Sequence, residues 1–281
     1  GHDTHGNGHG YGHYKSWFAC GWGQSLTVTD LTGAEGTDTL RFIDALHFAD
    51  VTLYLDGRDN APVVSVADQV VSESGTVAFP MEIVDFDGDG IAIDSVSATG
   101  GLVDVALLDG DTRDCASGML YELTFDTDGA YEGLALGEDA VVVVTVVIDD
   151  GRGGLIAREV QITVNGENDA PTLDAVTLAA EETGGPVGVD LAGYGDDIDS
   201  DDDGTTLIYT ITAPPVEGAA TVSGTQVIFD PTGFFTDLGQ GETRDVTFEV
   251  TATDRHGATA VNTVTVTVTG TNDAPQVTVS P

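Results

Sequence analysis

Acidic residues recur at matching places in two successive stretches of the chain. Both stretches carry an early Glu, an Asp-x-Asp pair, a late Gly-Glu and an Asp that ends a strand-like run. The acids are Glu73, Asp85, Asp87, Glu138 and Asp149 in the first stretch, and Glu181, Glu182, Asp197, Asp199, Glu242 and Asp254 in the second. Carboxylate oxygens are the ligands of hard cations, and Ca²⁺ takes about six to eight of them. Asp also forms turns, which explains any single Asp, but the shared positions favour a calcium site assembled from several loops.

A short element containing Asn, Asp, Ala and Pro separates these stretches. It reads GENDAP from Gly166 to Pro171 and GTNDAP from Gly270 to Pro275, with a looser copy, GRDNAP, from Gly57 to Pro62. The prolines are 109 residues (171 − 62) and 104 residues (275 − 171) apart. A period near 100 residues matches one small β-sandwich per repeat and is too long for a solenoid. Because proline favours extended backbone at and before its own position, we expect these elements to be stiff joints.

Short runs rich in β-branched residues, separated by Gly and Asp, fill both repeats and predict strands. Strands are expected over 63–66, 75–79, 91–97, 102–108, 119–125, 140–148 and 155–164, then over 172–178, 187–191, 206–211, 219–222, 226–229, 245–252 and 260–268. Three shorter ones are expected over 25–29, 39–43 and 51–55. The fold is therefore predicted to be all-β. The expected divisions are a His/Gly-rich lead-in over 1–15, a small β segment over 16–58, β-sandwiches over 59–169 and 170–272, and a following repeat or terminal strand over 273–281.

The charge of the chain limits its partners. It has 48 acidic and 8 basic residues, for a formal net charge of −40. Nucleic acids and anionic membranes bind basic surfaces, so neither is expected as a partner. No apolar run reaches the roughly 18–20 residues of a membrane span, so membrane insertion is not expected. High salt in a marine or halophilic setting would also relieve the repulsion, but the clustering of the acids favours bound divalent cations.

Two other groups of residues have chemistry of their own. His2, His5, His9 and His13 lie in a Gly-rich tract that either binds transition metals such as Zn, Ni or Cu or is simply solvated. Cys20 and Cys115 either form a disulfide or remain as two thiols. Both ends of the sequence look cut, and we expect it to be part of a longer chain.

Two groups of known motifs are absent from the sequence. The run from Asp85 to Gly90 opens like an EF-hand loop, but position 12 of that loop is Val96, and it is Ile208 when counted from Asp197; an EF-hand needs Glu there. The chain has no GxSxG, HExxH, P-loop or dinucleotide fingerprint. Paired carboxylates of the kind that glycosidases use are present, so residue type alone does not exclude a glycosidase. These acids lie beside turns at repeat boundaries, where a cleft is not expected, and we therefore expect a protein that is not an enzyme.

The joints, the early Glu, the Asp-x-Asp pair, the late Asp and a last strand of alternating Val and Thr together resemble cadherin-like bacterial repeats. These include VCBS-type and RTX-adhesin modules, and the resemblance covers about residues 59–275. The run GTDTLRFIDALHFADVTLYL, from Gly36 to Leu55, resembles a segment that often closes the nonapeptide repeats of secreted RTX proteins. In the cadherin family, calcium ions lie between consecutive Ig-like domains and rigidify a rod.

The resemblance implies calcium ligands at each joint. At the inner joint they are Glu73, Glu138, Glu167, Asn168, Asp169, Asp197, Asp199 and Asp254. At the first joint they are Asp59, Asn60, Asp85, Asp87 and Asp149. At the last joint they are Glu182, Glu242, Asn272 and Asp273.

These features predict a calcium-rigidified stalk segment of a secreted or surface-anchored bacterial adhesin. Its partners would be neighbouring repeats or subunits, and a host or matrix receptor or glycan. One alternative is a filament or surface-layer subunit, in which a strand from 276–280 adds to a neighbour's segment 16–55. Another is a calcium-dependent carbohydrate-binding module that uses Trp17 or Trp22.

Overall fold

The computed structural model describes most of both repeats and parts of the preceding segment. The described residues are 26–29, 37–40, 45–47, 52–54, 59–85, 90–113, 116–152 and 155–273. The chain divides into two compact units. The first unit comprises residues 1–71, 75–128 and 141–163, and the second comprises residues 72–74, 129–140 and 164–281.

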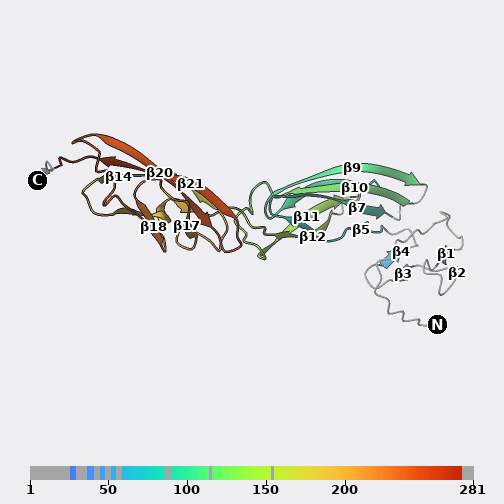
Figure 1. Ribbon diagram of the computed structural model, residues 1–281. Helices are drawn as coiled ribbons and strands as arrows, with labels where there is room; N and C mark the ends of the chain where they lie inside the picture. The colour runs from blue at the N-terminus through green and yellow to red at the C-terminus, as the bar shows by residue number, and fades with distance from the viewer. Residues whose placement is uncertain are drawn as a thin grey trace, which may run out of the picture. The chain divides into compact units, whose positions relative to one another are not determined.

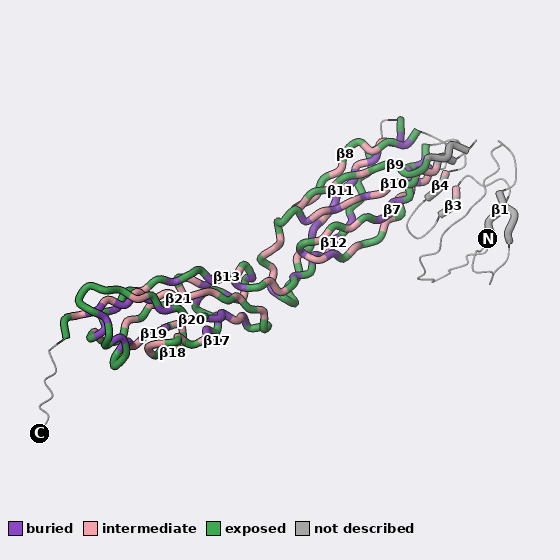
Figure 2. Tube along the Cα trace, turned by 45° about the horizontal axis from the view of Figure 1, so that its top comes forward, coloured by how far each residue is buried: buried purple, intermediate pink, exposed green. Residues whose placement is uncertain are grey.

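The first sandwich is built from two four-stranded sheets (Figure 1). One sheet has the order β5 (Val63–Ser65), β7 (Thr76–Asp85), β10 (Ala116–Asp126) and β9 (Leu102–Arg113). The other has the order β6 (Gln69–Ser72), β12 (Leu155–Asn165), β11 (Asp139–Asp149) and β8 (Ala92–Ala98). Along β11 the buried residues alternate with more exposed ones, as expected for a strand with one face on a core (Figure 2). Val142, Val144, Val146 and Ile148 are all fully buried.

The second sandwich has a four-stranded and a three-stranded sheet. The first has the order β14 (Val176–Glu181), β21 (Thr259–Thr269), β20 (Thr243–Thr253) and β17 (Ile208–Ala213); the second has the order β15 (Val187–Asp190), β19 (Gln226–Asp230) and β18 (Ala219–Ser223). Strand β14 runs parallel to β21, and the other pairs in these sheets are antiparallel. Phe229 lies in the core between these sheets and stacks on Phe248, with 6.3 Å between ring centroids.

The predicted strand over 172–178 is instead two strands. β13 (Thr172–Leu173) pairs with the two-residue β16 (Gly195–Asp196), whereas β14 pairs with β21. The chain changes partner at Asp174, whose N–H donates to the carbonyl of Tyr194 at 2.8 Å. A short 3-10 helix, η1 (Leu191–Gly193), precedes β16. Strands β6 and β16 are absent from the prediction because runs this short carry no clear alternation.

In the segment before the first sandwich, the described residues form two antiparallel strand pairs. β1 (Leu26–Thr29) pairs with β2 (Thr37–Leu40), and β3 (Ala45–His47) with β4 (Thr52–Tyr54). The predicted metal-binding and disulfide residues His2, His5, His9, His13, Cys20 and Cys115 lie outside the described residues. Within the described part of the chain, no helix has the length and apolar character needed to cross a membrane.

Tyr209 provides a test of the packing in the second sandwich. Its buried hydroxyl shares one proton between the carbonyls of Leu191 (3.2 Å) and Gly204 (2.9 Å). Burial, and then nearby carboxylates, raise the pKa of Tyr209 from 10 to about 12. In the unfolded chain the phenol ionises near pH 10, so this group's contribution to stability is present below pH 10 and is lost as the pH rises toward 12.

Above pH 10, we expect the free energy of unfolding of the wild type to fall with pH more steeply than that of Tyr209→Phe. The difference between the two slopes should reach up to about 1.4 kcal/mol per pH unit. At neutral pH the variant is expected to be less stable by about 1 kcal/mol, because two buried carbonyls lose their donor. Urea unfolding at several pH values from 8 to 12 measures both effects. Parallel pH profiles of the two proteins would show that the hydroxyl is not held as described.

Candidate metal centre

The inner joint is held by backbone hydrogen bonds to two loops of the second unit. The N–H of Gly166 donates to the carbonyl of Glu138 at 2.9 Å, and the N–H of Glu73 donates to the carbonyl of Asn165 at 2.9 Å. A Cβ at Gly166 would lie 2.4 Å from the carbonyl oxygens of Leu134 and Ala135, so only glycine fits this close approach.

The last joint is built in the same way. The N–H of Gly270 donates to the carbonyl of Glu242 at 2.8 Å, and a Cβ there would lie 2.3 Å from the carbonyl oxygen of Gly239. The early Glu also has the same role in both repeats, because one carboxylate oxygen accepts from the residue after the joint glycine. Glu73 accepts from the N–H of Glu167 at 2.8 Å, and Glu182 accepts from the N–H of Thr271 at 2.8 Å.

Three of the predicted ligands converge at the inner joint. Carboxylate oxygens of Glu73, Asp169 and Asp199 all lie within 4.8 Å of one another. Glu73 and Asp199 are almost fully buried, with 2% and 3% of their surface exposed. The N–H of Asp169 donates to Oδ2 of Asp199 at 3.0 Å, which fixes the joint to the Asp-x-Asp loop. All three residues belong to the second unit, and we call them the acid cluster.

Several oxygens at the acid cluster are buried without a hydrogen-bond partner among the described residues. They are Oε2 of Glu73 and Oδ1 of Asp199, and, beside them in sequence, Oδ2 of Asp197 and Oδ1 of Asn168. A buried polar atom without a partner is strongly unfavourable in a folded protein. Each of these atoms is an oxygen, and oxygens are the donors that Ca²⁺ prefers. The donor set therefore fits a hard divalent cation.

Electrostatics at the cluster point the same way. Burial is the largest cause that raises the pKa of Glu73, Asp197 and Asp199, and neighbouring carboxylates raise it further, against the opposing effect of backbone N–H donors. When the pKa of a carboxyl group is higher in the folded chain than in the unfolded chain, the group must lose its proton at a cost to the folded state. The free energy of unfolding therefore falls as the pH rises from the unfolded pKa to the folded pKa. At neutral pH the metal-free fold therefore carries an unfavourable charge, which a bound cation would relieve.

Asp254 closes the loop that follows β20. Its Oδ1 accepts from the N–H groups of His256, Gly257 and Ala258, and its Oδ2 accepts from Nδ2 of Asn168 at 3.0 Å. Burial raises the pKa of Asp254, but these hydrogen bonds together outweigh burial and hold it below its ordinary value. Asp254 thus stays charged and orients the Asn168 amide, so that Oδ1 of Asn168 is left as a candidate ligand.

Glu138, Glu167 and Glu242 are exposed, and the structure gives their carboxylates other contacts. Glu138 accepts from the N–H of Ala135 (3.2 Å) and the hydroxyl of Ser200 (2.6 Å). Glu242 accepts from the N–H of Gly239 at 2.8 Å, in the corresponding turn of the second repeat. Glu167 accepts from the hydroxyl of Ser74 at 3.4 Å. These residues are not members of the acid cluster, and their ligand roles remain predictions.

The first joint places its predicted residues differently. Asp59 lies 3.5 Å from Nε of Arg152, and buried Asn60 exchanges hydrogen bonds with the backbone of Tyr54. Asp85 is fully buried, whereas Asp87 lies outside the described residues. Asp149 ends β11 and is partly exposed; Asp150, with 4% exposed, follows β11 as Asp254 follows β20. The alternation of buried residues along β11 points to Asp150, a signal that the sequence prediction did not use.

At the last joint, Glu182 is 4% exposed, and its Oε2 is buried without a partner among the described residues. Its Oε1 also accepts from the hydroxyl of Thr271 at 2.9 Å. Asn272 contacts the carbonyl of Asp273 through Nδ2 at 3.5 Å, similar to the 2.9 Å contact between Asn168 and Asp169 at the inner joint. The two joints therefore share their local construction.

Two acids next to the cluster were not among the predicted ligands. The side chain of Asp202 is 2% exposed and that of Asp201 22% exposed, and both are paired with Arg255. Each also has an Oδ1 that is buried without a hydrogen-bond partner in the described part of the chain. The acidic run from Asp199 to Asp203 was the available signal, but Asp residues in such a run also form turns, as Asp203 does.

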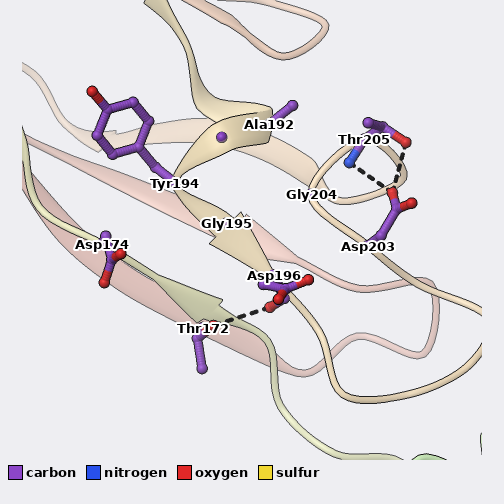
Figure 3. Close-up of a pocket in the computed structure, with 10 residues that line it drawn as sticks. Thr172, Asp174, Ala192, Tyr194, Gly195, Asp196, Asp203, Gly204 and Thr205 are labelled. Carbon is purple, nitrogen blue, oxygen red and sulfur yellow. Dashed lines mark hydrogen bonds between the residues drawn. The ribbon is translucent and has the colours of Figure 1, made fainter.

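A shallow pocket of about 520 Å³ lies elsewhere on the second unit and contains no acid-cluster residue (Figure 3). It is lined by parts of β13, η1 and β16 and by the turn from Asp203 to Thr205. Figure 3 shows Thr172 donating to the carbonyl of Asp196 and Thr205 donating to the Asp203 carboxylate. The Thr205 hydroxyl is the main group that lowers the pKa of Asp203. These polar groups stabilise the pocket wall.

The chain is similar to one protein family and to several solved structures. No curated protein matches the sequence. Among solved structures, the chain is similar to cadherin domains 1–4 of protocadherin gamma B7, with 17% identity and a TM-score of 0.41, over 73% of this chain and 49% of that one. It is also similar to domains EC1-2 of human mucin-like protocadherin (17% identity, TM-score 0.43, 75% of this chain and 98% of that one). An endo-fucoidan hydrolase of glycoside hydrolase family 107 matches at 16% identity and a TM-score of 0.29, over 89% of this chain and 34% of that one.

Residues 168–269 match the family described as "Bacterial Ig domain", so the second sandwich is similar to such a domain, and the predicted all-β, Ig-like fold is confirmed.

Proposed function

We propose that this chain is a calcium-rigidified, extracellular stalk segment of a bacterial surface adhesin, with repeats over 59–169 and 170–272. The observation that carries the proposal is the convergence of Glu73, Asp169 and Asp199, two of them almost fully buried, with unpartnered carboxylate oxygens. Among the described residues, no Lys or Arg is ion-paired with these three acids, so a bound divalent ion would supply the missing positive charge.

Five residues would hold the ion: Glu73, Asn168, Asp169, Asp197 and Asp199. They come from three segments that are far apart in sequence, namely the loop after β6, the joint and the loop after β16. The ion would supply positive charge and bonds to oxygen, and would thereby fix the joint to both loops. This role is mechanical, and it requires no reacting group.

The net charge of −40 suits such a role. Without calcium, clustered carboxylates repel one another, and the joints are expected to loosen. Extracellular calcium modules typically bind at about 10⁻⁴ to 10⁻³ M, so the stalk would stiffen on export. Glu182, Asn272 and Asp273 are proposed to serve the last joint, and Asp59, Asn60, Asp85, Asp87 and Asp149, together with Asp150, the first.

Thermal unfolding in calcium and in excess chelator, at matched ionic strength, tests the proposal. Calcium at about ten times its Kd should stabilise each occupied site by about 1.4 kcal/mol, which corresponds to a rise in Tm of several degrees. Magnesium at the same concentration controls for charge screening and is expected to have a smaller effect. Equal melting temperatures in calcium and in chelator would contradict the proposal.

A filament subunit joined by strand addition is a second candidate, and one observation favours it. Strand β9 lies at the edge of its sheet, and it exposes Leu102, Leu107 and Leu108 at 58%, 56% and 54%. An edge strand that exposes apolar side chains can pair with another chain. Sedimentation velocity over a wide concentration range separates the candidates, because a stalk segment stays monomeric whereas a subunit assembles.

A further inference from the structure

Arg255 occupies an unusual position beside the acid cluster. Its Nη1 lies 3.2 Å from Oδ2 of Asp201, and its Nε lies 3.2 Å from Oδ2 of Asp202. Its backbone N–H also donates to Oδ2 of Asp202 at 3.2 Å, and its Nη2 donates to the carbonyl of Asp201. One arginine thus holds two consecutive acids through their side chains and backbone.

These two acids belong to the same electrostatic group as the proposed calcium ligands. The carboxylate of Asp201 contributes to the raised pKa of Asp199, and that of Asp202 to the raised pKa of Asp197. The N–H of Asp202 donates to the carbonyl of Asp199 at 3.2 Å, so the loop that Arg255 holds is the loop that presents Asp199. Arg255 itself directly follows Asp254, which orients Asn168.

Arginine is suited to this position, and lysine is not an equivalent. The planar guanidinium presents several N–H donors in fixed directions and remains charged at every pH that a folded protein tolerates. It can therefore contact two carboxylates and a carbonyl at once. His256 adds a contact to Asp201 at 3.4 Å, through Nε2, but Arg255 is the group that reaches both acids.

We propose that Arg255 is a built-in counter-cation that limits calcium affinity at the inner joint and keeps the Asp199–Asp203 loop ordered when calcium is absent. The proposal rests on the calcium site proposed above. By pairing with Oδ2 of Asp201 and Asp202, Arg255 withholds these oxygens from a bound ion. Its positive charge also opposes the ion's entry. Affinity is thereby kept low enough for the joint to respond to changes in extracellular calcium.

Three variants separate charge from geometry. Arg255→Gln removes the charge and the guanidinium, and Arg255→Lys keeps the charge but loses the fixed set of donors. Arg244→Gln is the matched control, because Arg244 is also ion-paired, to Glu217 at 2.9 Å and Asp237 at 2.7 Å. Arg244 lies near the start of β20, whereas Arg255 follows its end, so the two are roughly 30 Å apart along the strand.

Calcium titration calorimetry and hydrogen exchange of peptides covering 199–203, in chelator, provide the two readouts. We expect Arg255→Gln to bind calcium about tenfold more tightly than the wild type, because a nearby positive charge is lost. Arg255→Lys should stay within about threefold, and Arg244→Gln within about twofold. In chelator, exchange in 199–203 should accelerate at least about tenfold in both Arg255 variants and stay unchanged in Arg244→Gln.

The two proposals fail in different ways. If the wild type binds no calcium, the stalk proposal and the affinity role of Arg255 both fail. If hydrogen exchange of residues 199–203 in chelator is the same in the Arg255 variants as in the wild type, the ordering role of Arg255 is overturned, whatever the calcium affinity. If the wild type binds calcium and Arg255→Gln binds it with the same or weaker affinity than Arg244→Gln, the proposed role of Arg255 is overturned and the calcium site stands.

Discussion

Asp199→Asn is expected to remove most of the calcium-dependent rise in melting temperature that the inner joint contributes, without unfolding the metal-free protein. The variant keeps the size of the side chain, and its amide oxygen can still accept from the N–H of Asp169. It loses one negative charge from the acid cluster, and the affinity of calcium sites depends strongly on the charge of their ligands. Calcium should bind at least about tenfold more weakly, which corresponds to about 1.4 kcal/mol.

The direction of the change in chelator makes this prediction specific. Burial and neighbouring carboxylates raise the pKa of Asp199, so its charge is unfavourable in the metal-free fold at neutral pH. Asp199→Asn should therefore melt at the same or a higher temperature than the wild type in chelator, and at a lower temperature in calcium. Glu249→Gln makes the same change of charge at an exposed position on β20 and should leave both temperatures nearly unchanged. A fall in both conditions would mean that Asp199 has only a structural role.

Phe229→Ala is expected to destabilise the second sandwich by about 3–5 kcal/mol. Phe229 is fully buried, stacks on Phe248 and lies 6.3 Å from the ring of Phe235. The close approach of Gly218, where a Cβ would lie 2.3 Å from the Phe229 ring, indicates that this part of the core is tightly packed. Removing the ring leaves a cavity that the two sheets cannot readily close.

Phe234→Ala is the matched control, since Phe234 is 41% exposed in the loop after β19. It removes the same ring and should destabilise the protein by less than about 1 kcal/mol. Hydrogen exchange of peptides from β19 and β20 measures the effect within the second sandwich. Equal protection factors in the two variants would show that Phe229 is not at the centre of the core.

The longer strands could be predicted because their alternation is regular. The Val-rich run of β11 and the Val/Thr alternation of β21 each place one face of the strand in the core. In both runs the two-residue period and the length of the run indicate a strand. The change of partner at Asp174 could not be predicted, because Thr172 to Leu178 reads as one continuous run in sequence. Which neighbour a strand pairs with is decided by tertiary contacts, such as the 2.6 Å hydrogen bond from Nδ2 of Asn262 to the carbonyl of Leu173.

The acid cluster was also predictable from the sequence only in part. Comparing repeats placed Glu73 and Glu182 at the same distance after a joint, 11 residues beyond its proline (73 − 62 and 182 − 171), and singled out the Asp-x-Asp pair that contains Asp199. The resemblance to cadherin-like repeats implied the ligand set that joins them with Asp169. The contacts of Glu138 could not be predicted in this way, since a Glu in a tight turn can reach back to a backbone N–H. The role proposed for Arg255 depends on contacts with Asp201 and Asp202, 54 and 53 residues away in sequence (255 − 201 and 255 − 202), which no local pattern reports.

Equilibrium dialysis of the whole chain against radioactive calcium is the most direct test of the account. It measures bound ions without relying on any change in stability, and Glu73→Gln combined with Asp199→Asn provides the comparison. We predict saturable binding to the wild type in the range of about 10⁻⁴ to 10⁻³ M, with at least one ion fewer per chain in the double variant. No saturable binding to the wild type, or the same number of ions in both proteins, would contradict a calcium site at the inner joint.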